Sequence, residues 1–153
     1  MNGLLAEPET PKNERLDGNP AEGSSSASSA SIRILYVDDE PTLRRFGELV
    51  LIRSGYEVDT AANGEEAWEA LKVRKYDLMI TDNHMPKLTG LELIGKMGAA
   101  GLRLPIILAS SIVNSLSRGD PPLFERGAML AKPFTPTQLV TVVKELLREV
   151  QPV

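Results

Sequence analysis

The sequence contains no cysteine and no long hydrophobic run, and each absence excludes a class of protein. Without cysteine the chain can form neither a disulfide nor a thiolate metal site, as is typical of proteins in a reducing compartment. No apolar stretch approaches the roughly 20 residues of a membrane span, and the N-terminus lacks the basic and apolar segments of a secretory signal. We therefore expect a cytoplasmic protein that does not interact with a membrane.

Clustered basic residues are also missing. The net charge is −4, and residues 1–30, with five acids and two bases, account for three of these negative charges. The remainder is nearly neutral and has no run of Lys or Arg. Binding to nucleic acid relies on such a basic surface, so we expect no nucleic-acid partner.

Residues 1–30 differ in composition from the rest of the chain. They are rich in Ser, Pro and Gly and offer little to bury, which predicts a disordered tail. The remaining residues, 31–153, are enough for one domain with a hydrophobic core. Because the chain ends at Val153, shortly after the last predicted helix, we expect a stand-alone domain without an effector domain.

Short apolar runs alternate with helical patterns from Ser31 onward. Helix start signals precede four of the helical patterns, at Pro41, Asn63, Thr89 and Thr135. The predicted strands cover residues 32–37, 56–61, 78–80, 105–109 and 129–131. This alternation predicts an α/β fold with a doubly wound, five-stranded parallel sheet, in which the short strand 56–61 lies at an edge.

The segment between the last two predicted strands is irregular. Residues 112–127 should hold a fourth helix, but Gly119-Asp120-Pro121-Pro122 lies in the middle of it. Proline inside a helix removes a hydrogen bond and clashes with the preceding turn. We therefore expect a short or broken fourth helix, which can restart with Asp120 as its cap.

Polar side chains follow the predicted strands where each one ends. Asp38 and Asp39 follow the first strand, Asp82 the third, Ser110 the fourth and Lys132 the fifth. The carboxyl ends of parallel strands meet at one edge of a sheet, where such folds bind ligands. Carboxylates that close repel one another unless a cation lies between them or one is protonated, and oxygen ligands suit Mg²⁺.

This set of groups is suited to phosphoryl transfer onto an aspartate. Asp82 would be the nucleophile, and Asp39 would bind Mg²⁺ with Asp38 as a second or water-mediated ligand. Lys132 and the Ser110 hydroxyl would contact oxygens of the arriving phosphoryl group. The structural alternative is that the acids are turn residues, Lys132 an exposed cation and Ser110 a strand-end hydroxyl.

Five motifs carry a resemblance to a known family. They are V-D-D-E-P at 37–41, A-A-N-G-E-E-A at 61–67, D-L-M-I-T-D-N-H-M-P-K-L-T-G at 77–90, L-P-I-I-L-A-S at 104–110 and G-A-M-L-A-K-P-F at 127–134. From Ile32 to about Val150 the chain resembles a response regulator receiver domain of the CheY type.

The resemblance implies a flavodoxin-like strand order 2-1-3-4-5 and phosphorylation of Asp82 by a histidine kinase or phosphotransfer protein, with Mg²⁺ required. It also implies that the backbone carbonyl of His84 is a further metal ligand and that the Lys132–Pro133 bond is cis. In the family the protein is a phosphoacceptor that acts by binding a downstream protein, and is not an enzyme in the ordinary sense.

Three residues occupy positions that modulate the family's behaviour. His84 and Ile112, two residues beyond Asp82 and Ser110, stand where side chains affect the lifetime of the phosphoryl group. His84 could instead be a solvated side chain. Met129 replaces the family's switch aromatic, and methionine can repack but with less definition.

Two other functions stay open. A phosphorylation-independent binding module of the same fold is one, and Met129 and the prolines at 121–122 are compatible with it. The other is a phosphatase with an aspartyl nucleophile, which usually has a second acid two residues after the nucleophile, where His84 stands here.

Overall fold

The structure, a computed structural model, describes residues 31–111 and 127–150. The described residues form a five-stranded parallel sheet of order β2-β1-β3-β4-β5. The strands are β1 (Arg33–Val37), β2 (Glu57–Ala61), β3 (Leu78–Asp82), β4 (Ile106–Ser110) and β5 (Gly127–Ala131). The predicted fold class and strand order are confirmed.

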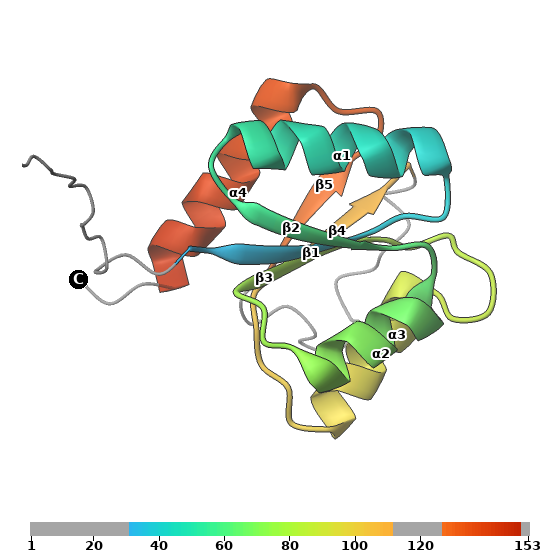
Figure 1. Cartoon of the computed structure of the whole chain (residues 1–153). Helices are drawn as coiled ribbons and strands as arrows, with labels where there is room; N and C mark the ends of the chain where they lie inside the picture. Colours follow the sequence, from blue (N-terminus) through green and yellow to red (C-terminus); the bar gives the residue numbers. More distant parts are fainter. Residues whose placement is uncertain (1–30, 112–126, 151–153) are drawn as a thin grey trace, which may run out of the picture. The chain divides into compact units, whose positions relative to one another are not determined.

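Helices cover both faces of the sheet (Figure 1). α1 (Pro41–Arg53) and α4 (Pro136–Val150) lie on one face, while α2 (Gly64–Val73) and α3 (Gly90–Ala99) lie on the other. Every residue of β3 and β4 is buried, as expected of strands covered on both faces. β2 is partly exposed, which confirms the predicted edge strand.

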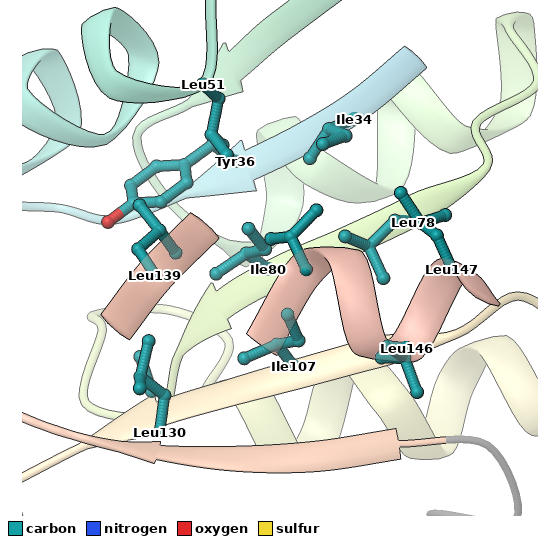
Figure 2. Close-up of a cluster of buried hydrophobic side chains, with 12 residues drawn as sticks. Ile34, Tyr36, Leu51, Leu78, Ile80, Ile107, Leu130, Leu139, Leu146 and Leu147 are labelled. Carbon is teal, nitrogen blue, oxygen red and sulfur yellow. The ribbon is translucent and has the colours of Figure 1, made fainter. Parts of the chain in front are cut away.

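Two hydrophobic cores flank the sheet. Figure 2 shows the core on the side of α1 and α4, where buried side chains of the sheet meet Leu51 of α1 and residues of α4. Its buried members are Ile34, Tyr36, Leu51, Leu78, Ile80, Ile107, Ala109, Leu130, Leu139, Val143, Leu146 and Leu147. The other core joins alternate strand residues, such as Leu35 and Met79, to α2 and α3. Alternation along each strand therefore fixes which of the two cores each strand residue faces.

α1 approaches the sheet very closely at Gly47. A Cβ atom at Gly47 would lie 2.2 Å from Cζ of Tyr36, so the Tyr36 ring occupies the space of the missing side chain. Tyr36 is only 2% exposed. This packing couples α1 to the strand that leads into Asp38.

Helix starts follow the predicted caps with one difference. Thr89 and Thr135 each form a reciprocal capping box, with Glu92 and Gln138 respectively. Asn63 also caps α2 by accepting from the Glu66 N–H, but the Glu66 side chain accepts from Ala62 N–H instead of from Asn63. The capping box that begins at Asn63 is therefore not fully reciprocal, because the Glu66 side chain bonds to the residue before the cap.

Some predictions fall outside the described residues. These are the disordered tail at 1–30, the broken fourth helix within 112–126, and the position of Ile112. Among the helices that the structure does describe, none combines the length and the apolar character needed to cross a membrane.

Candidate functional site

Four strand ends place the predicted site residues at one edge of the sheet. Asp38 and Asp39 directly follow β1, Asp82 ends β3, Ser110 ends β4 and Lys132 follows β5. Asp38, Asp82 and Ser110 are buried, with at most 7% exposure, whereas Asp39 is exposed. A largely buried polar site therefore lies at this edge of the sheet, open to solvent on the side of Asp39.

The three carboxylates form a compact cluster. One carboxylate oxygen from each of Asp38, Asp39 and Asp82 lies within 4.8 Å of the others. The register explains the proximity, because Tyr36 pairs with Ile80 and the residues two positions further along are Asp38 and Asp82.

Lys132 supplies the opposite charge within this cluster. Its ammonium Nζ donates to Asp38 Oδ2 at 3.0 Å and lies 3.3 Å from Asp82 Oδ2. Its side chain is only 15% exposed. The structural alternative of an exposed lysine does not hold, since Lys132 is a largely buried bridge between two acids.

The pKa values of the cluster follow from burial and charge. Burial raises the pKa of the Asp82 carboxyl; the Lys132 ammonium opposes this rise and the Asp38 carboxylate adds to it. For Lys132, burial lowers the pKa, but the hydrogen bond and charge of Asp38, together with Asp82, outweigh it, so that the pKa is raised overall. The lysine therefore stays charged at neutral pH.

Asp38 is held by hydrogen bonds from residues that follow it closely in the chain. The Glu40 N–H donates to Asp38 Oδ1 at 3.0 Å, and Arg44 Nη1 donates to the Asp38 carbonyl at 2.8 Å. Glu40 also caps α1 by accepting from the N–H groups of Thr42 and Leu43, which lowers its pKa. Both oxygens of Asp38 thus have a partner, one from the backbone and one from Lys132.

Sequence analysis missed the contributions of Glu40 and Arg44. The signal for Glu40 was present, because an acid directly before Pro41 is a helix cap position. Arg44 follows Glu40 by four residues, one helical turn along α1, and this spacing brings its guanidinium back to the helix start. Nothing in the sequence shows that its partner is the Asp38 carbonyl.

The chain after Asp82 also contacts the carboxylate. The His84 N–H donates to Asp82 Oδ1 at 3.4 Å, while the His84 side chain is exposed. The Thr81 hydroxyl donates to the Asp82 carbonyl at 2.9 Å. Met129 lies half-buried in β5, opposite Leu108 of β4, and the Lys132–Pro133 peptide is cis as expected.

The donor set of the cluster fits Mg²⁺. All the side-chain ligands available from Asp38, Asp39 and Asp82 are hard carboxylate oxygens. The exposure of Asp39 leaves room for the water ligands that Mg²⁺ usually keeps. The buried Lys132 already compensates part of the negative charge, so the acids need not be protonated to be brought together.

An apolar cleft adjoins the carboxylate cluster. It has a volume of about 330 Å³ and is lined by Leu43, Phe46, Ser111, Lys132, Pro133 and Phe134. The rings of Phe46 and Phe134 lie 6.1 Å apart between centroids, in a tilted arrangement. The cleft gives access to Lys132 from the side of α1.

Comparison with known proteins identifies the family. The sequence model of the response regulator receiver domain family matches residues 34–144 of this chain. The chain therefore belongs to the response regulator receiver family, the signalling domains of two-component systems, and the predicted family is confirmed.

One curated relative is a transcriptional regulatory protein. The chain is 34% identical over 123 residues to the transcriptional regulatory protein SrrA of Staphylococcus aureus, covering 79% of this chain and 50% of SrrA. It thus spans about half the length of the curated relatives it matches.

Two solved structures are also similar. The response regulator TrrA from Thermotoga maritima, in complex with Mg²⁺-BeF, is 36% identical, with a TM-score of 0.68 over 75% of this chain and 98% of TrrA. The signal receiver domain of a histidine kinase from Syntrophus aciditrophicus is 32% identical, with a TM-score of 0.67 over 80% of this chain and 95% of that domain.

The predictions of a stand-alone protein and of a cytoplasmic location stay predictions.

Proposed function

We propose that Asp82 accepts a phosphoryl group from a histidine kinase or a phosphotransfer protein, and that this modification changes the affinity of the domain for a downstream protein. The observation that carries the proposal is the ammonium of Lys132, which lies 3.0 Å from Asp38 and 3.3 Å from Asp82 in a largely buried site. A charge held so close to one carboxylate can contact a phosphoryl group attached to it.

The chemical step needs one nucleophilic oxygen and one leaving group. An Asp82 carboxylate oxygen attacks phosphorus, an O–P bond forms, and the P–N bond to the donor imidazole breaks. The leaving nitrogen keeps the electron pair and takes a proton from solvent. Asp82 must be ionised to act, and although burial raises its pKa, the Lys132 ammonium favours the charged form.

The neighbouring residues position and neutralise the transferred group. Lys132 would contact one phosphoryl oxygen, and the Ser110 hydroxyl a second. Asp38, Asp39 and Asp82, with the His84 carbonyl, would hold Mg²⁺, which when bound neutralises charge on the phosphoryl oxygens. The structure of TrrA, in complex with Mg²⁺-BeF, supports Mg²⁺ as the metal in this proposal.

Three further roles belong to the same proposal. The His84 side chain and Ile112 would set how long the phosphoryl group survives, and Met129 would repack when the phosphorylated state forms. A protein donor can approach over the apolar cleft beside Lys132. A downstream protein that prefers the phosphorylated conformation would shift the population toward it. That the domain binds neither nucleic acid nor a membrane stays a prediction.

Intact-mass measurement with acetyl phosphate and Mg²⁺ tests the proposal. We expect a gain of one phosphoryl group, about 80 Da, that is absent in EDTA and absent in Asp82→Asn. Glu69→Gln is the matched control, since Glu69 is an exposed acid of α2 that pairs only with the exposed Lys72 in the described part of the chain, and it should be modified like wild type.

The opposite result has a defined meaning. If wild type takes up no phosphoryl group, even from a competent histidine kinase, the phosphoacceptor role is wrong. The domain would then act as a phosphorylation-independent binding module, and Asp82→Asn would leave its partner binding unchanged.

A further inference from the structure

The residue that follows Asp82 is bonded to the start of α3. The Asn83 carbonyl accepts from the Gly90 N–H at 3.0 Å, and the Asn83 side-chain Oδ1 accepts from the Leu91 N–H at 3.0 Å. The first N–H groups of a helix have no partner within the helix. One residue thus satisfies two of them, and we call this pair of hydrogen bonds the Asn83 clasp.

The Asn83 clasp is reinforced by close packing. A Cβ atom at Gly90 would lie 2.5 Å from the Asp82 carbonyl oxygen and 3.0 Å from the Asn83 Cα. The first residue of α3 therefore rests directly against the Asp82–Asn83 peptide. On the other side, the Asn83 N–H donates to the Ala109 carbonyl of β4 at 3.3 Å. The peptide is held between a strand and a helix.

The contacts of the next residue depend on how this peptide is oriented. The His84 N–H reaches Asp82 Oδ1 at 3.4 Å, which is long for an N–H···O hydrogen bond. A small rotation at Asn83 would either lose this contact or tighten it. The same rotation would redirect the His84 carbonyl, which is assigned above as a metal ligand.

We propose that Asn83 is a positioning residue of the phosphorylation site, because the Asn83 clasp fixes the direction of the Asp82 carboxylate and of the His84 carbonyl. The inference rests on the proposed function. The alternative is that Asn83 only caps α3. Thr89 provides the comparison, since its hydroxyl accepts from the Glu92 N–H at 3.1 Å at the same helix end, and the hydrogen bonds of Thr89 within the described residues all go to α3.

The test separates these two roles by measuring Mg²⁺ binding without a phosphoryl donor. Asn83→Ala, Asn83→Leu and Thr89→Ala are each expected to lower the midpoint of urea unfolding. Calorimetric titration with MgCl₂ should show a loss of affinity of about tenfold only for the two Asn83 variants. Asn83→Asp keeps an acceptor oxygen and should bind Mg²⁺ at least as tightly as wild type.

A second measurement uses the wild-type chain and needs no substitution. If the Asn83 clasp orients the metal ligands, bound Mg²⁺ must in turn stabilise the Asn83 clasp. Amide hydrogen exchange at Leu91 should therefore slow on saturation with Mg²⁺, and by more than exchange at Glu92.

Several outcomes overturn the inference. They are equal Mg²⁺ affinities for Asn83→Ala and Thr89→Ala, Leu91 exchange that Mg²⁺ leaves unchanged, and a wild-type chain that binds no Mg²⁺. Failure of the proposed function looks different. In that case the Asn83 variants lose Mg²⁺ affinity as expected, but wild type gains no phosphoryl mass.

Discussion

Lys132→Met removes the ammonium that lies between two buried carboxylates while keeping most of the apolar stem. In EDTA we expect the free energy of unfolding to fall by about 3 kcal/mol. The physical reason is that Asp38 and Asp82 would stay buried, close together and without a positive charge between them.

The magnitude follows from the distances and the burial. At an effective dielectric constant of about 20, unit charges 3.0 to 3.3 Å apart attract by about 5 kcal/mol per pair. Desolvation of the ammonium, 15% exposed, offsets a large part of this attraction. Loss of one partner from a buried pair typically costs about 3 to 5 kcal/mol, and protonation of Asp82 would relieve some of that cost.

Urea unfolding of both proteins at pH 7 measures this effect. Lys72→Met is the matched control, because Lys72 pairs with Glu69 at 2.9 Å but both side chains are largely exposed. Its loss should stay below about 0.5 kcal/mol. The deficit of Lys132→Met should also grow as the pH rises, since the pKa of Asp82 rises further without the ammonium.

Added Mg²⁺ provides the sharper half of the test. A ligand at a hundred times its Kd stabilises the folded state by about 2.7 kcal/mol. Without the competing ammonium, the acids of Lys132→Met should gain more stability from MgCl₂ than those of wild type. A loss under about 1 kcal/mol in EDTA, or a smaller Mg²⁺ gain in the variant, would refute the reasoning.

Two further predictions concern Asp82 and Gly47. Burial raises the Asp82 pKa above its ordinary 3.8, so its contribution to stability is lost as the pH rises through the folded pKa. In EDTA, Asp82→Asn should therefore be more stable than wild type at pH 7 and lose this advantage toward pH 4. Equal stability at both pH values would contradict this. Gly47→Ala should cost about 2 kcal/mol because its Cβ would meet the Tyr36 ring, although alanine favours helices. Gly95→Ala, with open space around it in α3, should instead gain up to about 1 kcal/mol in thermal unfolding, and a gain at both sites would refute the packing argument.

Much of the fold could be predicted because its signals are local. A buried parallel strand is a short apolar run, and in this chain four such runs end abruptly in polar residues. Once the strands were placed, Asp38, Asp82, Ser110 and Lys132 had to share an edge, and the structure does bring them together there. Their chemical roles stay predictions.

The remaining features depend on contacts between distant parts of the chain. Lys132 bridges to Asp38 across 94 positions in sequence, and no local pattern specifies which acid it contacts. Asn83 looks like an ordinary loop residue after a strand, and only the folded structure shows that the start of α3 is hydrogen-bonded to it. Gly47 lies inside a helical pattern, but the sequence does not show which side chain packs against it. Only the folded structure places the Tyr36 ring there.

The packing of Gly47 on Tyr36 also limits how α1 can move. The helix also contacts the residue that follows β1, since Arg44 donates to the Asp38 carbonyl at 2.8 Å. The contacts at Arg44 and Gly47 lie about one helical turn apart, so α1 cannot shift far without moving the residues it touches. Closely packed interiors transmit such displacements. Leu49 and Ile52 lie exposed on the same helix. A molecule that binds Leu49 and Ile52 and displaces α1 would therefore also displace Asp38.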